Sequence, residues 1–249
     1  MRLDDKIALV TGSSRGIGRG IALTFAEHGA RVVITYNRNE QAGLDTTKEI
    51  LDKGGEGTCR HLDVRDPVSI NRLFDEIKEK YGTLDILVNN AAILEQKPCE
   101  TILPEEWDEM FAVDCRGVFL CSQQAVKIMQ PKRFGRIINI TSIGGQWGGN
   151  LAVHYSAAKA AVISITRSFA RIYSAYNITT NALSPGLVET DMSRAETATE
   201  AGKWKIEAIP LKRMATIDEI SHVALFLASD SASYITGQTI NANGGMYFG

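Results

Sequence analysis

Residues 10–18, VTGSSRGIG, join a short apolar run, KIALV at residues 6–10, to a longer run in which apolar residues recur with helical spacing. Gly12, Gly16 and Gly18 permit a tight turn and the close approach of a ligand to the backbone. The first N–H groups of a helix have no partner within it and lie at the positive end of its dipole. The stretch therefore predicts a strand, a turn and a helix that together bind phosphate. The Gly-Lys-Ser/Thr ending of a P-loop is absent.

Short apolar runs alternate with longer helical patterns along the rest of the chain. The predicted strands are residues 6–10, 31–35, 84–88, 136–141 and 238–242, and the predicted helices include residues 16–28, 39–53, 69–82 and 104–129. Most of these strands are too uniformly apolar for a one-sided sheet, which is typical of buried parallel strands. We therefore predict an α/β fold of three layers, a doubly wound parallel sheet of about seven strands with helices on both faces. Its ligands should lie beyond the carboxyl ends of the strands.

Composition excludes several other classes of protein. The 249 residues are 44% hydrophobic with a formal net charge of −2, which is typical of a globular protein and gives no electrostatic reason to expect nucleic acid. The N-terminal MRLDDKIALV resembles neither a signal peptide nor an anchor, and no run of about 18 apolar residues could span a membrane. The four cysteines form no C-x-x-C pair and the histidines no H-E-x-x-H, so neither disulfides nor a metal site is expected. We expect a cytoplasmic protein, and no linker divides it into domains.

The stretch HYSAAK at residues 154–159 suggests acid–base chemistry. Tyr155 and Lys159 are four residues apart, so on a helix they share one face. A phenol has a pKa near 10, and a cation one turn away favours phenolate and lowers that pKa. The pair therefore predicts a general acid or base at Tyr155.

The glycine stretch also supports a competing hypothesis. Residues 12–16 also match G-x-S-x-G, the nucleophile elbow of serine hydrolases, with Ser14 as the nucleophile. An elbow needs an oxyanion loop from an earlier strand, but only eleven residues precede Gly12. His222 is available as a base, although no pattern marks it. The hydrolase is therefore the weaker alternative.

Taken together, the motifs resemble the short-chain dehydrogenase/reductase family over essentially the whole chain. They are T-G-x-x-x-G-x-G at residues 11–18, NNAA at 89–92, Ser142, Tyr155-x-x-x-Lys159 thirteen residues after that serine, Asp63-Val64, PGLVET at 185–190 and YITGQ at 234–238. The resemblance implies that residues 1–249 form a single NAD(P)-binding Rossmann-fold domain carrying both cofactor and substrate sites. It also implies a homotetramer, built through the small residues around the Tyr155 helix.

The resemblance assigns the site residues as well. Tyr155 is the implied acid or base, Lys159 also holds the nicotinamide ribose, and Ser142 donates a hydrogen bond to the substrate oxygen, where charge develops. The implied cofactor contacts are Gly12, Ser14, Arg15, Gly16, Ile17, Gly18, Tyr36, Asn37, Arg38, Asp63, Val64, Asn89, Ala91, Tyr155, Lys159, Pro185, Gly186, Val188 and Thr190.

The end of the second strand indicates which cofactor is used. An enzyme that prefers NAD(H) places Asp or Glu there to bind the adenosine ribose 2′-OH. Tyr36 stands at this position, and Arg15 and Arg38 could pair with a 2′-phosphate. NADP(H) is therefore favoured over NAD(H).

One departure from the family pattern concerns catalysis. The usual V-N-x-x-G-V-F is VDCRGVF here, which puts Asp114 at the position of an Asn that helps place a water in the proton relay from Lys. NNAA in place of NNAG is a milder change. The substitution leaves open a protein that binds NADP(H) to regulate a partner without catalysis.

The substrate is a small carbonyl compound or secondary alcohol whose identity stays open. Its contacts are predicted to be Ser142, Gln146, Trp147, Asn150 and Tyr155. With His154, the mixed polar and aromatic lining suits a sugar, polyol or hydroxy acid, as in an NAD-linked sugar or polyol dehydrogenase. Similarity to β-ketoacyl carrier-protein reductases instead indicates an acyl thioester, with Arg136, Arg167 and Arg171 as contacts for an acidic carrier. The resemblance also implies that residues 192–209 form a mobile lid, because enzymes of the family close such a helical insert over cofactor and substrate.

Overall fold

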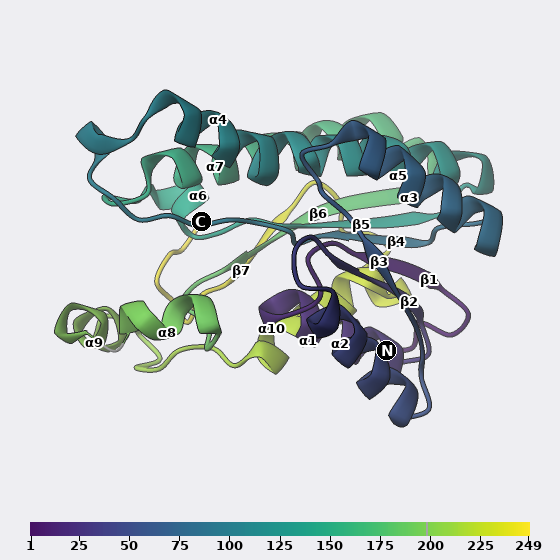
Figure 1. Ribbon diagram of the computed structural model, residues 1–249, viewed down its shortest axis with the longest axis horizontal. Coiled ribbons are helices and arrows are strands. Elements are labelled where there is room, and N and C mark those ends of the chain that lie inside the picture. The colour runs from purple at the N-terminus through teal and green to yellow at the C-terminus, as the bar shows by residue number, and fades with distance from the viewer. Residues whose placement is uncertain (198) are drawn as a thin grey trace.

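The protein is built on a seven-stranded parallel sheet. The computed structural model describes residues 1–197 and 199–249. The strand order is β3-β2-β1-β4-β5-β6-β7, and every neighbouring pair is parallel (Figure 1). The strands are β1 Ile7–Val10, β2 Arg31–Tyr36, β3 Glu56–His61, β4 Ile86–Asn89, β5 Gly135–Ile140, β6 Ile178–Pro185 and β7 Thr239–Ala242.

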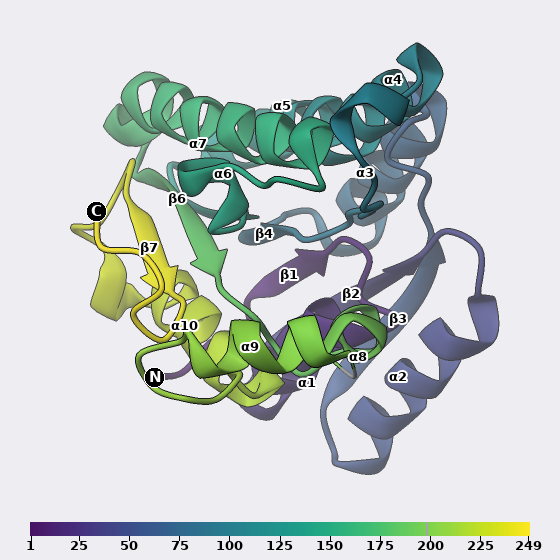
Figure 2. The same ribbon diagram turned by 90° about the vertical axis from the view of Figure 1, so that its left-hand side faces the viewer.

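Helices cover both faces of the sheet, which confirms the predicted three-layer architecture. Figures 1 and 2 show one layer of α1, α2 and α10 and an opposite layer of α3, α5 and α7. Their bounds are α1 Gly16–Glu27, α2 Glu40–Asp52, α10 Ile217–Ala228, α3 Pro67–Tyr81, α5 Gly117–Lys132 and α7 Val153–Tyr173. The shorter helices are α4 Pro104–Phe111, α6 Gly144–Trp147, α8 Asp191–Thr197 and α9 Glu200–Glu207. Within the described residues, no helix is both long and apolar enough to cross a membrane.

The two layers explain why the central strands are apolar throughout. Along β1, Ala8 and Val10 join the core beneath α1 and α10, whereas Ile7 and Leu9 join the core beneath α3 and α5. Successive side chains of a strand point to opposite faces, so a strand covered on both faces needs apolar residues at every position.

Strands β3 and β6 and helices α6 and α10 lie outside the segments predicted from the sequence. β3 is an edge strand, EGTCRH, and no residue of it is fully buried. β6, ITTNALSP, is buried throughout although it carries Thr and Asn. α10 begins at a capping box, in which Thr216 and Glu219 each bond the other's backbone N–H. That pair, preceding an apolar run, is a signal that could have predicted the helix.

The predicted helix at residues 104–129 is interrupted by a π turn. α4 ends at Phe111, residues Ala112–Arg116 form one π-helical turn, and α5 follows from Gly117. A π turn inserts an extra residue into a helix and is frequent at functional sites. Asp114 lies in the middle of it and is completely buried.

Candidate active site

The glycine stretch joins β1 to α1 at the carboxyl edge of the sheet. Gly12 has φ +62°, and a Cβ there would lie 2.8 Å from the Cα of Ala91. A Cβ on Gly18 would lie 2.6 Å from the carbonyl oxygen of Gly12. The turn therefore needs glycine at both positions, and the backbone there is open to the close approach that a diphosphate requires. These residues fit the pyrophosphate of a dinucleotide at the start of α1.

Asn90, which the sequence reasoning missed, fastens the loop after β4 to this turn. Its Nδ2 donates to the carbonyl oxygens of Thr11, at 2.9 Å, and Gly12, at 3.1 Å, while its backbone N–H donates to Thr11 Oγ1 at 2.9 Å. Ala91 also donates its backbone N–H to Thr11 Oγ1, at 3.0 Å. The loop after β4 is thereby held against the glycine turn.

Asn89 faces the interior. Its Nδ2 donates to Ser122 Oγ at 2.9 Å and to Asn139 Oδ1 at 2.8 Å, and the side chain is buried. The next link is Asn139 Nδ2, which donates to Thr166 Oγ1 at 2.9 Å. This buried network joins β4, β5, α5 and α7, so Asn89 positions the site from behind.

The residues predicted to bind the adenosine end gather after β2 and β3. Tyr36 is half-buried, and its ring meets His61, its partner in the β2–β3 register, at 5.6 Å between centroids. Burial and a hydrogen bond to Glu40 raise the pKa of Tyr36. Asn37, Arg38 and, at the start of α1, Arg15 are exposed. An acidic side chain, Glu40, is therefore present near the adenosine end, although the end of β2 itself carries Tyr36 in place of an acid.

Asp63 is engaged by a neighbouring cation. Arg65 Nη2 lies 2.5 Å from Asp63 Oδ2, and Arg65 Nη1 lies 2.5 Å from Glu109 Oε1. The hydrogen bond from Arg65 lowers the pKa of Asp63. The carboxylate is therefore ionised and oriented, and Val64 beside it is buried.

Ser142, Tyr155 and Lys159 come together where β5 ends and α7 begins. Ser142 follows β5 by two residues, and its Oγ accepts a hydrogen bond from the backbone N–H of Gly144 at 3.1 Å. Lys159 Nζ lies 5.5 Å from the ring centroid of Tyr155 and donates to the carbonyl oxygen of Ile140 at 3.2 Å. The structure therefore unites the three side chains that the motif predicts.

Several neighbours act on the Tyr155 proton. Burial raises the pKa of Tyr155, Lys159 acts to lower it, Asp114 acts to raise it, and a hydrogen bond from Ser142 acts to lower it. Burial is the strongest single influence on the pKa of Lys159 and acts to lower it, but the combined effects of Asp114, Tyr155 and Cys115 exceed it, so the pKa is raised. Lys159 is therefore held as an ammonium ion beside the phenol.

Asp114 is the counter-ion of Lys159. Its Oδ2 lies 3.2 Å from Lys159 Nζ, with the two side chains 0% and 2% exposed. Its Oδ1 accepts a hydrogen bond from the backbone N–H of Ile93 at 2.9 Å. Burial raises the pKa of Asp114, while Lys159 and the Ile93 N–H oppose that shift. The residue that departs from the family pattern thus touches the predicted catalytic lysine.

The structure places the predicted substrate residues in two different environments. Trp147 is 61% exposed, and Asn150 is exposed beside it. Gln146 instead donates its amide to Ser184 Oγ at 3.0 Å and to Asn241 Oδ1 at 2.6 Å. Gln146 therefore ties α6 to β6 and β7. Its amide N–H groups are used within the protein.

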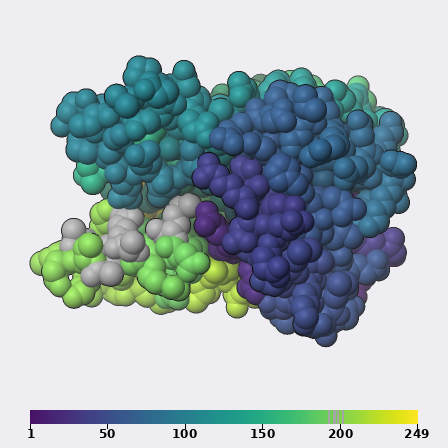
Figure 3. Space-filling view, viewed as in Figure 1, coloured from purple at the N-terminus to yellow at the C-terminus, as the bar shows by residue number. Residues whose placement is uncertain are grey.

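The segment after β6 lies along the same edge of the sheet. A Cβ on Gly186 would lie 2.9 Å from the Cα of Asn243, and Val188 is buried and forms a bridge with Ala215. The backbone N–H of Thr190 donates to Ser193 Oγ at 3.1 Å, which joins this segment to α8. The predicted lid, residues 192–209, corresponds to parts of α8 and α9, and position 198 within it lies outside the described residues. Figure 3 shows the surface hollowed between α4 and the α8–α9 segment.

The prediction that Arg136 contacts an acidic carrier is wrong. Arg136 lies near the start of β5, away from the carboxyl edge, and is 2% exposed. Its Nη2 lies 3.4 Å from Asp230 Oδ1, and its guanidinium carbon lies 4.5 Å from the ring centroid of Phe134. Arg167 and Arg171 are exposed on α7.

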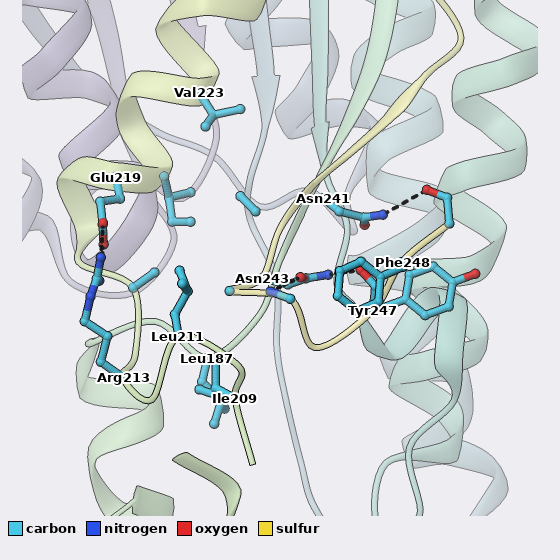
Figure 4. Close-up of a pocket in the computed structure, with 16 residues that line it drawn as sticks. Leu187, Ile209, Leu211, Arg213, Glu219, Val223, Asn241, Asn243, Tyr247 and Phe248 are labelled. Atoms are coloured by element: carbon cyan, nitrogen blue, oxygen red, sulfur yellow. Dashed lines mark hydrogen bonds and ion pairs between the residues drawn. The ribbon is translucent and has the colours of Figure 1, made fainter. Parts of the chain in front are cut away.

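A separate cavity of about 540 Å³ lies beside β7 (Figure 4). It is lined by residues from the end of α9 to α10 and by the C-terminal tail, including Leu211, Val223, Asn243 and Tyr247. Arg213 and Glu219 form an ion pair of 2.6 Å at its wall. None of the lining residues is Ser142, Tyr155 or Lys159, so this cavity is distinct from the candidate active site. Within residues 1–197 and 199–249, no group of three or more His, Cys, Asp or Glu side chains is placed to hold a metal ion.

The chain is similar over nearly its whole length to known reductases. Residues 12–247 match a family model described as "Enoyl-(Acyl carrier protein) reductase". The 3-oxoacyl-(acyl-carrier-protein) reductase FabG of Escherichia coli (strain K12) is 40% identical over 247 residues, which cover 99% of each chain. FabG of Staphylococcus epidermidis (strain RP62A) is also 40% identical, over 243 residues that cover 98% of this chain and 99% of that one.

Solved structures give the same relationship. A gluconate 5-dehydrogenase from Burkholderia cenocepacia J2315, crystallised with NADP and tartrate, superposes with a TM-score of 0.94. It is 34% identical, and the alignment covers 98% of this chain and 96% of that one. The fold and the site define an NAD(P)-linked oxidoreductase acting on carbonyl or CH–OH groups. The chain belongs to the short-chain dehydrogenase/reductase family. Membership disfavours the serine hydrolase, whose required base, His222, is exposed on α10.

Proposed function

We propose that the protein is an NADP(H)-dependent oxidoreductase in which Tyr155 is the general acid for a carbonyl and the general base for an alcohol. The observation that carries the proposal is the meeting of Ser142, Tyr155 and Lys159 at the same carboxyl edge of the sheet as the glycine turn. One domain would supply both the cofactor site and the substrate site.

Each of these side chains has a defined part in the chemistry. The bound nicotinamide supplies or accepts the hydride. In reduction, Tyr155 donates its proton to the substrate oxygen, and the Lys159 ammonium stabilises the phenolate that remains. The Ser142 hydroxyl donates a hydrogen bond to the same substrate oxygen, where negative charge develops. The reverse transfers operate in oxidation.

The preference for NADP(H) rests on charge at the adenosine end. Arg15 and Arg38 are exposed near the carboxyl end of β2, where they can pair with a 2′-phosphate. The negative charge of Glu40 opposes this preference, because its carboxylate lies at the same end of the site, within hydrogen-bond reach of the Tyr36 hydroxyl. The gluconate 5-dehydrogenase of similar structure was crystallised with NADP, which supports the same choice.

A 3-oxoacyl thioester is the first candidate substrate. Ile93, Trp147 and Leu151 are exposed apolar side chains near the site, and they suit an acyl chain better than a polyol. A hydrogen bond of 2.8 Å from the Lys97 N–H to the Leu151 carbonyl joins the loop after β4 to the segment before α7. The 40% identity to FabG agrees with this choice, and exposed Arg167 and Arg171 remain available for an acidic carrier.

A hydroxy acid is the second candidate. It is favoured by the TM-score of 0.94 with a gluconate 5-dehydrogenase that holds tartrate. The two candidates separate in a direct assay that compares NADPH oxidation by acetoacetyl-CoA with NADP⁺ reduction by gluconate. A higher kcat/KM with the thioester supports the first candidate. Failure of every carbonyl and alcohol tested, with NADPH still bound, would instead indicate the non-catalytic regulator.

The proposed state is a cytoplasmic homotetramer. Ala160 is exposed on α7 and Ala157 and Ala161 are half-buried, which leaves a surface of small side chains open to another helix, whereas Ala158 is used inside the protein. Phe119 on α5 and Ile172 on α7 add exposed apolar area to this outer layer. Light scattering coupled to size-exclusion chromatography tests the tetramer, and a monomer at micromolar concentration would contradict it.

A further inference from the structure

Arg65 binds both carboxylate oxygens of Asp63. Its backbone N–H and its Nε–H each donate to Asp63 Oδ1 at 2.9 Å. Its Nη2 donates to Asp63 Oδ2 at 2.5 Å, and Nε also lies 3.1 Å from that oxygen. Paired N–H···O contacts between a guanidinium and a carboxylate fix the geometry of both groups. Arg65 therefore holds the Asp63 carboxylate in one orientation.

Two other elements hold Arg65 in turn. Its Nη1 lies 2.5 Å from Oε1 of Glu109 on α4. Arg116, in the π turn, donates from Nη2 to the backbone carbonyl oxygen of Arg65 at 3.2 Å. The guanidinium thus lies between two carboxylates that belong to different parts of the fold. Its position is set by α4 and the π turn, and does not depend on the Asp63 segment alone.

The backbone that carries Asp63 is fixed at the adenosine end of the predicted cofactor site. The N–H of Leu62 donates to the carbonyl oxygen of Tyr36 at 2.8 Å, which holds the segment after β3 beside the end of β2. A Cβ on Gly117 would lie 2.9 Å from the Cβ of Val64, so Val64 packs directly against the start of α5. Asp63 therefore has a fixed place at the carboxyl edge of the sheet.

One acceptor position of Asp63 remains open. An ionised carboxylate has acceptors only, at about four positions. Arg65 supplies three N–H groups to them, from its backbone, Nε and Nη2. The Asp63 side chain is 20% exposed, so a group outside the protein can reach the remaining position. That position suits a single N–H donor, whereas a carbonyl oxygen there would face the negative charge of the carboxylate.

We propose that Arg65 is a positioning residue, which orients Asp63 to accept one hydrogen bond from the 6-amino group of the cofactor's adenine. The proposal rests on the function proposed above and deepens it, because it names how the adenosine end of that cofactor is recognised. Arg65 acts through Asp63 and does not contact the adenine. Without Arg65, the carboxylate keeps its charge but is free to rotate toward water, so its acceptor loses a fixed direction.

The test compares the dissociation constants of NADPH and of its 6-oxo analogue, reduced nicotinamide hypoxanthine dinucleotide phosphate, measured by fluorescence titration. The analogue has a carbonyl oxygen where adenine has its amino group. The parent should bind NADPH about tenfold more tightly, the effect of one hydrogen bond to a charged group. In Arg65→Ala the ratio should fall to within about threefold, because the oriented acceptor is lost. Arg65→Lys should give an intermediate ratio, since an ammonium cannot form the paired contacts.

Two further comparisons separate positioning from other roles of Arg65. Arg60→Ala removes an arginine of β3 that pairs with Glu76, and it should leave the ratio unchanged. In an Asp63→Ala background, Arg65→Ala should change the ratio no further, as a double-mutant cycle requires of a residue that acts through another. Independent effects in this cycle, the same ratio in Arg65→Ala as in the parent, or equal binding of the two nucleotides by the parent would each overturn the proposal.

The binding measurement also keeps this proposal apart from the proposed function. It needs no turnover, so absence of Tyr155-dependent catalysis would overturn the proposed function and leave the role of Arg65 to be decided by the ratio. Failure of the parent to bind NADPH would overturn both. If Arg65→Ala does not fold, Glu109→Gln decides, because it removes the charge that anchors Arg65 and leaves the contacts of Asp63 in place. An unchanged ratio in that variant would then overturn the proposal.

Discussion

Asp114 Oδ2 lies 3.2 Å from Lys159 Nζ, and both side chains are shielded from solvent. Removing one member of a buried ion pair leaves an uncompensated charge, which typically costs about 3 to 5 kcal/mol. The aspartate at the family's usual Asn position is therefore coupled to the predicted catalytic lysine, and its charge reaches Tyr155. Replacing Asp114 should therefore change the pH dependence of the reaction.

The Asp114→Asn variant should shift the pH profile of alcohol oxidation toward lower pH. Tyr155 acts as a base only after losing its proton, and Asp114 raises the pKa at which it does so. Removing that negative charge lowers the Tyr155 pKa, so the rising alkaline limb should begin at lower pH. The measurement is kcat against pH with NADP⁺ and a secondary alcohol. If the alkaline limbs of the two pH profiles coincided, the charge of Asp114 would have no effect on the pKa of Tyr155.

The Tyr155→Phe variant should lose at least about 100-fold in turnover, the scale of general acid–base catalysis. The ring remains, so the dissociation constant for NADPH, measured by fluorescence, should change little. Ser156→Ala, one residue further along α7, serves as the matched control. Turnover of Tyr155→Phe equal to that of the parent would remove Tyr155 from the role of proton donor.

Replacing Arg15 and Arg38 together by Ala should erode the preference for NADPH over NADH by about 1 to 3 kcal/mol, the range of charge-assisted hydrogen bonds. The ratio of the two kcat/KM values reports the change. Arg171→Ala, an exposed arginine at the far end of α7, is the control. Equal use of the two cofactors by the parent, or an unchanged ratio in the double variant, would refute the assignment.

Gln146→Ala should lower the free energy of unfolding by about 1 to 3 kcal/mol, because it leaves Ser184 and Asn241 without their shared donor. Trp147→Ala, next in sequence and 61% exposed, should lower it far less. Urea unfolding measures both. If Gln146→Ala were as stable as the parent but raised KM strongly, Gln146 would be a substrate contact, as its sequence position suggests.

The sequence predicted the fold where the apolar pattern is uniform. β1, β2, β4 and β5 are buried on both faces, and their runs of Val, Ile and Leu carry an unambiguous signal. β6 has no such apolar run, because polar residues within it are buried with partners. Asn181 donates its amide N–H to the Ile235 carbonyl and accepts a hydrogen bond from the Gln238 N–H. Partners that distant in the chain cannot be read from local composition. β3 was not predicted for a different reason: it is an edge strand, where exposed polar residues are tolerated.

The candidate site was predicted through motifs, which name residues but do not show the contacts that the residues make. Ser142, Tyr155 and Lys159 follow from their spacing, and the structure brings them together. Asn90 was overlooked because its role, bonding the Thr11 and Gly12 carbonyls, depends on β4 lying beside β1. The contact between Asp114 and Lys159 likewise required the packing of the π turn against α7.

The π turn at Ala112–Arg116 makes the segment from α4 to α5 sensitive to its length. Each residue of an α-helix advances about 100° around its axis, and a π turn takes up one additional residue by widening, so the helix beyond it keeps its orientation. Met110 before the turn and Cys121 after it are both buried. Deleting one residue between them would give a regular α-helix of nearly the same composition, without the widened turn that carries Asp114. The count of residues here, as much as their identity, keeps Asp114 directed at Lys159.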